Sequence, residues 1–348
     1  MEVAPDPPCG TGQADAPTAR APFGLWRRLD QWWFAPMVPE RLAVLRIGVG
    51  TYAWLALVIL SPSLLNYTSF ATAYFAPVGP VAVFLAAPLP AGWLYLALGM
   101  ALLLGPAFIW GYRFWLTGPV FALLMLWLMA YRSSWGMVFH TDNLLVMHLL
   151  ILAAAPAAAA CSLDTRWRAR QRTRPPLAWH EIAAGRYGWP VRLMCLATTI
   201  TYAMAGWAKW QRGGAEWFLG EMLQRQIAYD NLRKIALGSA HSPLGVALLE
   251  WGWIFPLLAW LTFVVEFAAP LALCGTRVAW WWVLGVWSFH VGILCCMAIV
   301  FPYPLSSVAF WSFFAVEKLT THAGFRRVFA GPTPPLPALR SGGDQGGE

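Results

Sequence analysis

Charged residues are scarce in this sequence. Asp, Glu, Lys and Arg make up 11% of the 348 residues, against about 25% in soluble domains, whereas hydrophobic residues make up 59%. A chain of this composition has too little polar surface to cover a folded core in water. The composition therefore excludes an ordinary soluble domain. It predicts an integral membrane protein, with the lipid bilayer as its first partner.

Acidic residues are fewer than basic ones, 16 against 24, so the formal net charge is +8. The basic residues lie mostly in short loops between apolar runs rather than in one patch. This distribution is typical of residues that orient a membrane protein. The sequence therefore predicts no nucleic-acid partner, and it identifies no protein partner.

Cysteines are also few, and no CxxC pair or histidine stands at metal-ligand spacing. All but Cys9 lie in or beside apolar runs, so we expect small core residues rather than a disulfide framework, and no metal site. The six are Cys9, Cys161, Cys195, Cys274, Cys295 and Cys296.

The two ends of the chain differ from its middle. Residues 1–23 are rich in Pro, Ala and Gly without periodicity, and they lack the charged start and apolar core of a signal peptide. Residues 321–348 become similarly rich in Pro and Gly from Gly331. We predict two disordered tails that flank one transmembrane domain over residues 24–320.

About eight apolar stretches predict an all-α, polytopic helical bundle in the cell membrane. Both termini then lie in the cytoplasm, together with the loop 164–187, which carries six arginines. The predicted spans are 42–60, 91–111, 114–130, 143–163, 190–209, 251–274, 278–300 and 305–316.

Shorter features accompany these spans. Residues 26–34 and 216–236 predict amphipathic helices at the membrane surface, and the proline-broken stretch 61–90 is expected to pack at the outer face. Arg46, one turn into the first span, is expected to extend its guanidinium back to the interface. The alanine-rich run 153–160 predicts close approach of a neighbouring helix.

Basic residues also lie on the predicted outer side, between residues 209 and 243, against the usual charge rule. Either they bind an anionic group, or this long loop crosses the membrane regardless of its charge. They are Lys209, Arg212, Arg225, Arg233 and Lys234.

Lys209 lies about 25 Å of helix from the inner end of its span, near the outer boundary. It could be an interfacial anchor. Alternatively, Tyr202, Trp207, Trp210 and Trp217 could shield the amine and favour its neutral form, which is a base. The same aromatic residues could equally form an interfacial belt.

Glu266 and His290 lie about 12 and 18 Å from the inner face on consecutive antiparallel spans. We expect them to be partners, either as a proton relay or as a structural clamp between two helices. His148 and His140 are more typical of core or rim histidines than of ligands, and Asn143 is expected to cap a helix.

Several short motifs occur in the order and spacing of one known family. The central one is Tyr202-x-x-Ala205-Gly206-x-x-Lys209, followed by Trp217-x-x-Gly220-Glu221. The sequence resembles the HTTM domain, the transmembrane part of vitamin K-dependent gamma-carboxylase and its bacterial relatives, over residues 40–311. The supporting motifs are Arg41-Leu-Ala-Val-Leu-Arg-Ile-Gly48, Glu266-x-x-x-Pro270-Leu-x-Leu, Phe289-His290 and Phe301-Pro-Tyr303-Pro-Leu-Ser-Ser307.

The resemblance implies a membrane oxygenase that deprotonates a reduced naphthoquinone or another quinol. The family's catalytic lysine falls on Lys209, and a shared histidine falls on His290. Two departures weigh against protein carboxylation. Ala208 replaces a second lysine of the carboxylase, and about thirty residues follow the last span where carboxylases carry a large extracytoplasmic domain.

Two functions therefore stand as expectations. The first is an enzyme acting on a lipid-soluble substrate at the outer leaflet, with Lys209 as base, Glu266 and His290 as polar support, and Tyr202, Trp207 and Trp210 around the quinol. The second is a non-catalytic lipid or quinone binder or partner subunit, in which the same residues are structural. Transport is less favoured, because no inverted repeat is evident.

Overall fold

The computed structural model describes residues 24–171, 183–325 and 328–329. Over these ranges the regular structure is helical without a β-strand, and one isolated bridge joins Met37 to Ala184. The predicted all-α class is therefore confirmed. The predicted tail 1–23 lies outside the described residues, as does the predicted tail 321–348 except for residues 321–325 and 328–329, of which Ala323–Phe325 form a short helix. Arg172 and Arg174 of the basic loop also lie outside them.

Four of the described helices are long and apolar enough to cross a membrane. A helix of about 20 residues spans the hydrocarbon core of a bilayer, about 30 Å thick. The structure thus supports a membrane protein but does not confirm the count of eight spans. The four helices are α2 (Pro39–Asn66), α4 (Ala91–Trp110), α5 (Phe114–Ser133) and α12 (Thr276–Met297).

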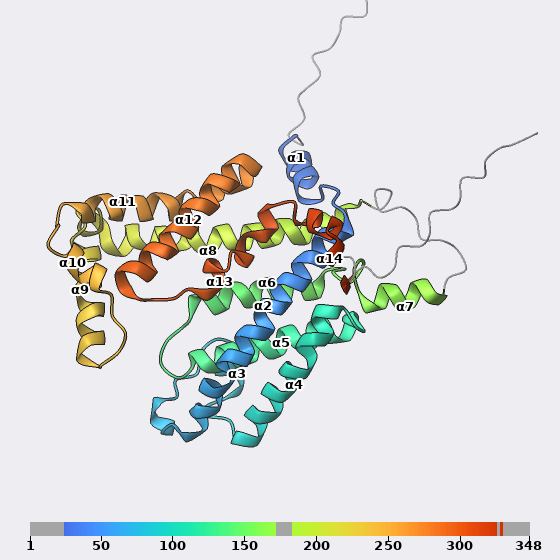
Figure 1. The fold of residues 1–348 in the computed structure, drawn as a ribbon, viewed down its shortest axis with the longest axis horizontal. Coiled ribbons are helices and arrows are strands. Elements are labelled where there is room, and N and C mark those ends of the chain that lie inside the picture. Colours follow the sequence, from blue (N-terminus) through green and yellow to red (C-terminus); the bar gives the residue numbers. More distant parts are fainter. Residues whose placement is uncertain (1–23, 172–182, 326–327, 330–348) are drawn as a thin grey trace, which may run out of the picture.

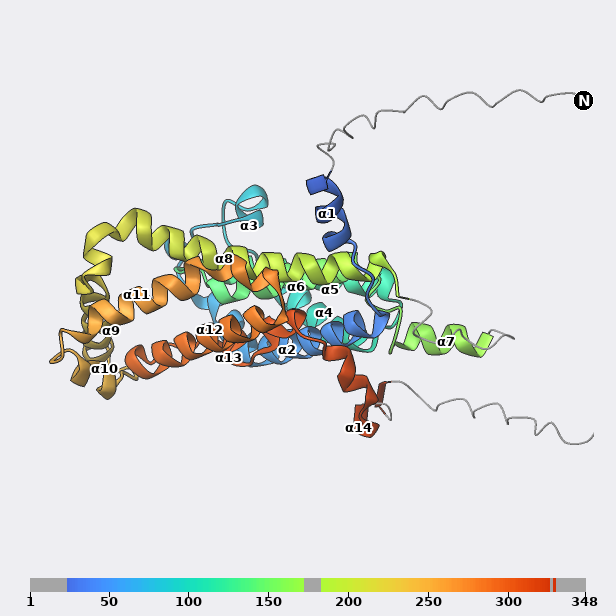
Figure 2. The ribbon, with the colours of Figure 1, turned by 90° about the horizontal axis from the view of Figure 1, so that it is seen from above.

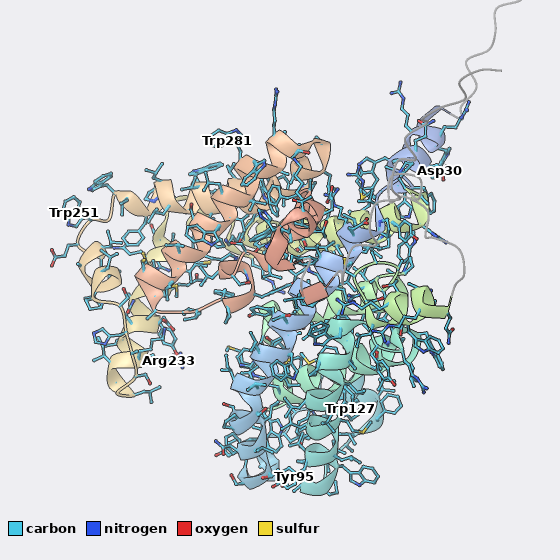
Figure 3. The ribbon with its side chains drawn as sticks, turned by 45° about the vertical axis from the view of Figure 1, so that its right-hand side comes forward. Asp30, Tyr95, Trp127, Arg233, Trp251 and Trp281 are labelled. Atoms are coloured by element: carbon cyan, nitrogen blue, oxygen red, sulfur yellow. The ribbon has the colours of Figure 1, made fainter. Side chains whose placement is uncertain are left out.

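Large apolar side chains cover much of the outside of these helices. Trp281 on α12 points away from the bundle (Figure 3) and is 75% exposed. Leu103 on α4 is 79% exposed. A contiguous apolar exterior of this kind is stable in lipid and unfavourable in water. The exposure therefore agrees with the composition in indicating a membrane environment.

The helices form two packed groups that share α6 (His140–Ala154). Helices α2, α4 and α5 pack with α6 on one side, and α8 (Gly185–Phe218), α11 (Ile254–Phe267) and α12 lie together on the other (Figure 1). Because α6 contacts both α5 and α8, it joins the two groups.

Short helices gather at opposite ends of the molecule (Figure 2). At one end lie α1 (Gly24–Trp33), α7 (Leu163–Gln171) and α14 (Ala323–Phe325). At the other lie α9 (Glu221–Ala236) and α10 (Pro243–Leu248). Thus α1 covers most of the predicted helix 26–34, and α9 covers the predicted helix 216–236 except for its first residues, which end α8 before a break at Gly220.

The stretch 61–90 is broken as its prolines predict. Helix α2 continues through Pro62 to Asn66, and the chain then forms the 3₁₀ turns η1 (Tyr67–Ser69) and η2 (Thr72–Tyr74). The short helix α3 (Pro80–Phe84) follows and packs on α5.

The predicted helical span over 143–163 is wrong in its second half. Helix α6 ends at Ala154, and Ala155 is extended, with φ −92° and ψ 159°. Pro156 explains the break, because proline disfavours the helical conformation of the residue before it and has no N–H to donate. The alanine-rich run therefore forms turns rather than a helix surface.

Arg46 supplies hydrogen-bond donors to backbone carbonyls in the non-helical stretch that follows this break. Its side chain has no exposed surface, and it donates to the carbonyls of Ile109 (3.3 Å), Ala157 (2.7 Å) and Cys161 (2.6 Å). The expected extension of Arg46 to the interface is therefore wrong. The guanidinium instead ties α2 to the end of α4 and to the non-helical stretch after α6.

Two of the last three predicted spans, 251–274 and 305–316, also differ from expectation around their prolines. The stretch 251–274 is α11 followed by the 3₁₀ helix η4 (Ala269–Cys274), which contains Pro270. The stretch 305–316 is not one helix but lies across α13 (Pro302–Leu305) and η5 (Val308–Phe313), and η6 (Val316–Thr321) follows. Ser307, with φ 65°, separates α13 from η5.

Candidate functional site

Lys209 lies in the interior of the long helix α8, not at its end. The helix continues past residue 209, where the predicted span ends, to a kink at Gly214, where φ is 47° and ψ is −137°, and then resumes to Phe218. The kink redirects the last turn of α8, and Trp217 in that turn donates from its indole nitrogen to the carbonyl of Ala259 on α11, 3.2 Å away. This bond fixes the ring of Trp217 near the lysine.

Gly206, one turn before Lys209, sets the distance between α8 and α11. A Cβ at this position would lie 2.8 Å from the backbone nitrogen of Phe267 and 3.0 Å from its Cα. No side chain fits there without moving the α11 backbone. The glycine thus lets the two helices approach closely where Glu266 projects from α11.

Lys209 and Glu266 form an ion pair at this close approach. The distance from Nζ of Lys209 to Oε2 of Glu266 is 2.6 Å, and the two side chains are only 18% and 5% exposed. The ammonium also lies 4.8 Å from the ring centre of Trp217 and 5.1 Å from that of Phe289. Lys209 is therefore a largely buried ion-pair partner with aromatic neighbours rather than a free interfacial anchor.

The expected partnership of Glu266 with His290 is not observed, because each has another partner. The hydroxyl of Tyr202 lies 2.8 Å from Nε2 of His290, and both residues are buried. Within the described residues, the other ring nitrogen of His290, Nδ1, is buried without a hydrogen-bond partner. His290 is the neighbour in sequence of Phe289, whose ring centre lies 5.1 Å from the ammonium of Lys209.

The two tryptophans expected around a quinol lie elsewhere on α8. Trp207 and Trp210 are 45% and 54% exposed, and Trp210 packs against Phe218 and Phe263. The aromatic rings in contact with the ammonium are those of Trp217 and Phe289. Phe289 has no predicted role of its own, although its position beside His290 in the sequence is a usable signal.

The other polar residues singled out from the sequence are satisfied within the fold. His148 is buried, and its two ring nitrogens lie 2.7 Å from the Tyr303 hydroxyl and 3.0 Å from that of Thr198. It is a core histidine that links α6 to α13 and α8. The side chain of His140 lies outside the described part of the structure. Among the described residues, no group of three or more His, Cys, Asp or Glu side chains is placed to bind a metal ion.

The cations of α9 have carboxylate partners close by in the chain. Arg225 pairs with Glu216 and Glu221, and Lys234 pairs with Asp230, at 2.7 Å in the last case. Lys234 also donates to the carbonyl of Met297 at the end of α12. These pairs give the basic residues of this segment a local structural role.

Substituting Gly206 by alanine is expected to lower the free energy of unfolding by about 1–3 kcal/mol, because the new methyl group collides with the α11 backbone. Gly99→Ala in α4 is the matched control, since a Cβ there has no atom within 4 Å. The control should be neutral or slightly stabilising. Thermal unfolding in detergent measures both. Equal melting temperatures for the two variants would contradict the proposed close contact.

The function of the site has to be inferred from its geometry, because no protein-family description, curated protein or solved structure matches the chain. What the residues offer is a buried amine, a carboxylate within proton-transfer distance of it, two flanking rings and a histidine with one open nitrogen.

Proposed function

We propose that this protein is an HTTM-type membrane enzyme that uses Lys209 as a base toward a quinol or another lipid-soluble substrate at the outer leaflet. The observation that carries the proposal is the ion pair of Lys209 with Glu266, in which the ammonium lies close to two aromatic rings. An amine held away from water beside a proton acceptor can be deprotonated, and the neutral amine removes protons.

The proton balance at the pair is simple. In the ion pair the ammonium carries three protons and the carboxylate none. Transfer of one proton across the 2.6 Å between Nζ and Oε2 leaves a neutral amine beside a carboxylic acid. The lone pair then accepts the proton of a substrate hydroxyl, and the resulting ammonium stabilises the substrate anion.

The surroundings suit a planar substrate with an acidic hydroxyl. The rings of Trp217 and Phe289 flank the amine and offer faces on which an aromatic ring can stack. The open Nδ1 of His290 is available to a second substrate oxygen, and the Tyr202 hydroxyl holds the imidazole from its other side. A reduced naphthoquinone has this shape and these groups.

We further propose that the chain crosses the membrane eight times, with both termini on the cytoplasmic side. Helices α6 and α11 have 15 and 14 residues, so each is about 21–22 Å long and too short to span alone. Non-helical backbone at membrane depth is tolerated where it is buried in protein. The stretch after α6 and the 3₁₀ helix η4 would complete these spans.

The same ion pair also supports a second function. Lys209 and Glu266 satisfy each other's charge, as a structural clamp between α8 and α11 would. In that case the protein binds a lipid or quinone, or serves as a partner subunit, without catalysis. The test must therefore separate the basicity of Lys209 from its charge.

The variant Lys209→Arg makes this separation, because a guanidinium keeps the positive charge opposite Glu266 but is not deprotonated in proteins. We expect purified wild-type protein in detergent to consume oxygen when given a reduced naphthoquinone, with quinone epoxide as product. Lys209→Arg should fold normally and lose at least about a hundredfold in rate, the scale of general-base catalysis. An oxygen electrode and mass analysis of the quinone provide the readouts.

Either of two results would reject the enzyme. One is no oxygen uptake by wild type above a protein-free control. The other is equal uptake by wild type and Lys209→Arg. If the oxidised quinone still quenches tryptophan fluorescence in a saturable way, the non-catalytic binder is the better function.

A further inference from the structure

A cavity of about 1160 Å³ is lined by residues of α7 and of the segments around it. Helix α7 projects from one end of the molecule (Figure 2). The walls of the cavity come from separate parts of the chain: the turn between α4 and α5, the non-helical stretch after α6, the first turns of α7 and the start of α8. Five arginines line it. They are Arg113, Arg166, Arg168, Arg170 and Arg186.

One carboxylate, that of Asp164, lines the same cavity, and it is already engaged. Its two oxygens accept the backbone N–H groups of Arg113 (2.7 Å) and Phe114 (2.9 Å) at the start of α5. Asp164 therefore stabilises a helix N-terminus, where a negative charge is favourable. Among the described residues, the cavity lining carries five positive charges against one negative charge.

Within the described residues, none of the five arginines forms an ion pair with a carboxylate. Arg166 donates to the carbonyl of Val328 at 2.8 Å, and its Nε is buried without a partner in the same ranges. Arg186 donates to the hydroxyl of Tyr187 at 2.7 Å. Each guanidinium has five N–H donors, so most of the N–H groups of these arginines remain available to a ligand.

The remaining walls are apolar and aromatic. Alanines and Pro156 of the non-helical stretch line one side, and Trp115 and Trp167 lie nearby with 78% and 64% of their surface exposed. Exposed tryptophans at the end of a membrane bundle are typical of the headgroup level. The cavity thus combines cationic groups with an apolar side at the depth where lipid headgroups lie.

We propose that this cavity binds the phosphate of an anionic phospholipid from the leaflet at the α7 end of the bundle. Arginine binds phosphate oxygens through two parallel N–H groups, which suits a phosphate ester better than a single point charge does. Basic pockets between transmembrane helices recognise anionic headgroups in this way. The apolar wall accommodates the start of the acyl chains.

A titration of the detergent-purified full chain with phosphatidylglycerol, followed by native mass spectrometry, tests the site. The test variant is Arg168→Gln/Arg170→Gln, and the matched control is Arg27→Gln/Arg28→Gln on α1. All four arginines are exposed, and both variants remove two charges at the same end of the molecule. Phosphatidylcholine and inorganic phosphate serve as competing probes.

We expect wild type to retain phosphatidylglycerol and not phosphatidylcholine. The test variant should bind phosphatidylglycerol roughly thirtyfold more weakly, at about one kcal/mol per arginine, and the control should change by less than about twofold. Equal weakening in both variants would overturn the site in favour of general charge attraction. Displacement of the lipid by an equal concentration of inorganic phosphate would overturn the lipid assignment in favour of a free-phosphate site.

Discussion

Substitution of Arg46 by methionine is expected to cause the largest loss of stability of any single change at a non-glycine position in this protein. Methionine fills part of the same space but leaves the carbonyls of Ile109, Ala157 and Cys161 without their buried donor. Each unsatisfied buried group costs about 1–3 kcal/mol, and more where the lost partner was charged. The sum is comparable with a whole domain's free energy of unfolding, about 5–15 kcal/mol.

The measurement is the yield of monodisperse protein in detergent and its thermal unfolding. Arg27→Met on the exposed face of α1 is the matched control, and it should behave as wild type. Arg46→Lys should be intermediate, because an ammonium keeps the charge but does not reproduce the planar fork that reaches three carbonyls. A melting temperature of Arg46→Met equal to that of the control would show that the three carbonyls have other partners.

The second large effect is expected at the ion pair of Lys209 and Glu266. Lys209→Met leaves a buried carboxylate alone, and Glu266→Leu leaves a buried ammonium alone. Each single variant should lose about 3–5 kcal/mol of stability. The double variant Lys209→Met/Glu266→Leu should recover most of this loss, because an apolar pair of similar volume often replaces a buried ion pair without cost.

A double-mutant cycle of thermal or denaturant unfolding measures the coupling between the two residues. Losses that simply add in the double variant would show that Lys209 and Glu266 do not interact in the folded protein. The double variant serves a second purpose. If it folds as expected, it provides a stable protein without the amine, in which oxygen uptake must be absent if Lys209 is the base.

Much of the fold could be predicted from hydrophobicity alone. The bounds of α4, α5 and α12 follow the apolar runs closely, because proline, glycine or arginine residues interrupt each run near its ends. The alanine-rich stretch after α6 could not be predicted in this way. Alanine favours a helix locally, and the donor that stabilises the alternative, Arg46, comes more than one hundred residues earlier.

The residues of the candidate site could be identified from the sequence, but their pairing could not. The depth predicted for Glu266 below the inner face assumes that residues 251–274 form one α-helix. Residues of the 3₁₀ helix η4, however, rise about 2.0 Å each instead of about 1.5 Å. This difference moves Glu266 about 3 Å toward the predicted depths of both His290 and Lys209, so depth alone does not select its partner. The close approach at Gly206, a tertiary feature, then brings it to Lys209 rather than to His290.

The contacts of Arg46 also impose an order on biogenesis. A ribosome completes α2 well before it makes Ala157 and Cys161, which lie 111 and 115 residues farther along the chain. Until then the guanidinium has none of these carbonyls to bind in the membrane, where an unsatisfied charge is costly. We therefore expect α2 to remain near the insertion machinery or the lipid surface while α4, α5 and α6 emerge. On this expectation the four helices α2, α4, α5 and α6 enter the lipid together rather than one at a time.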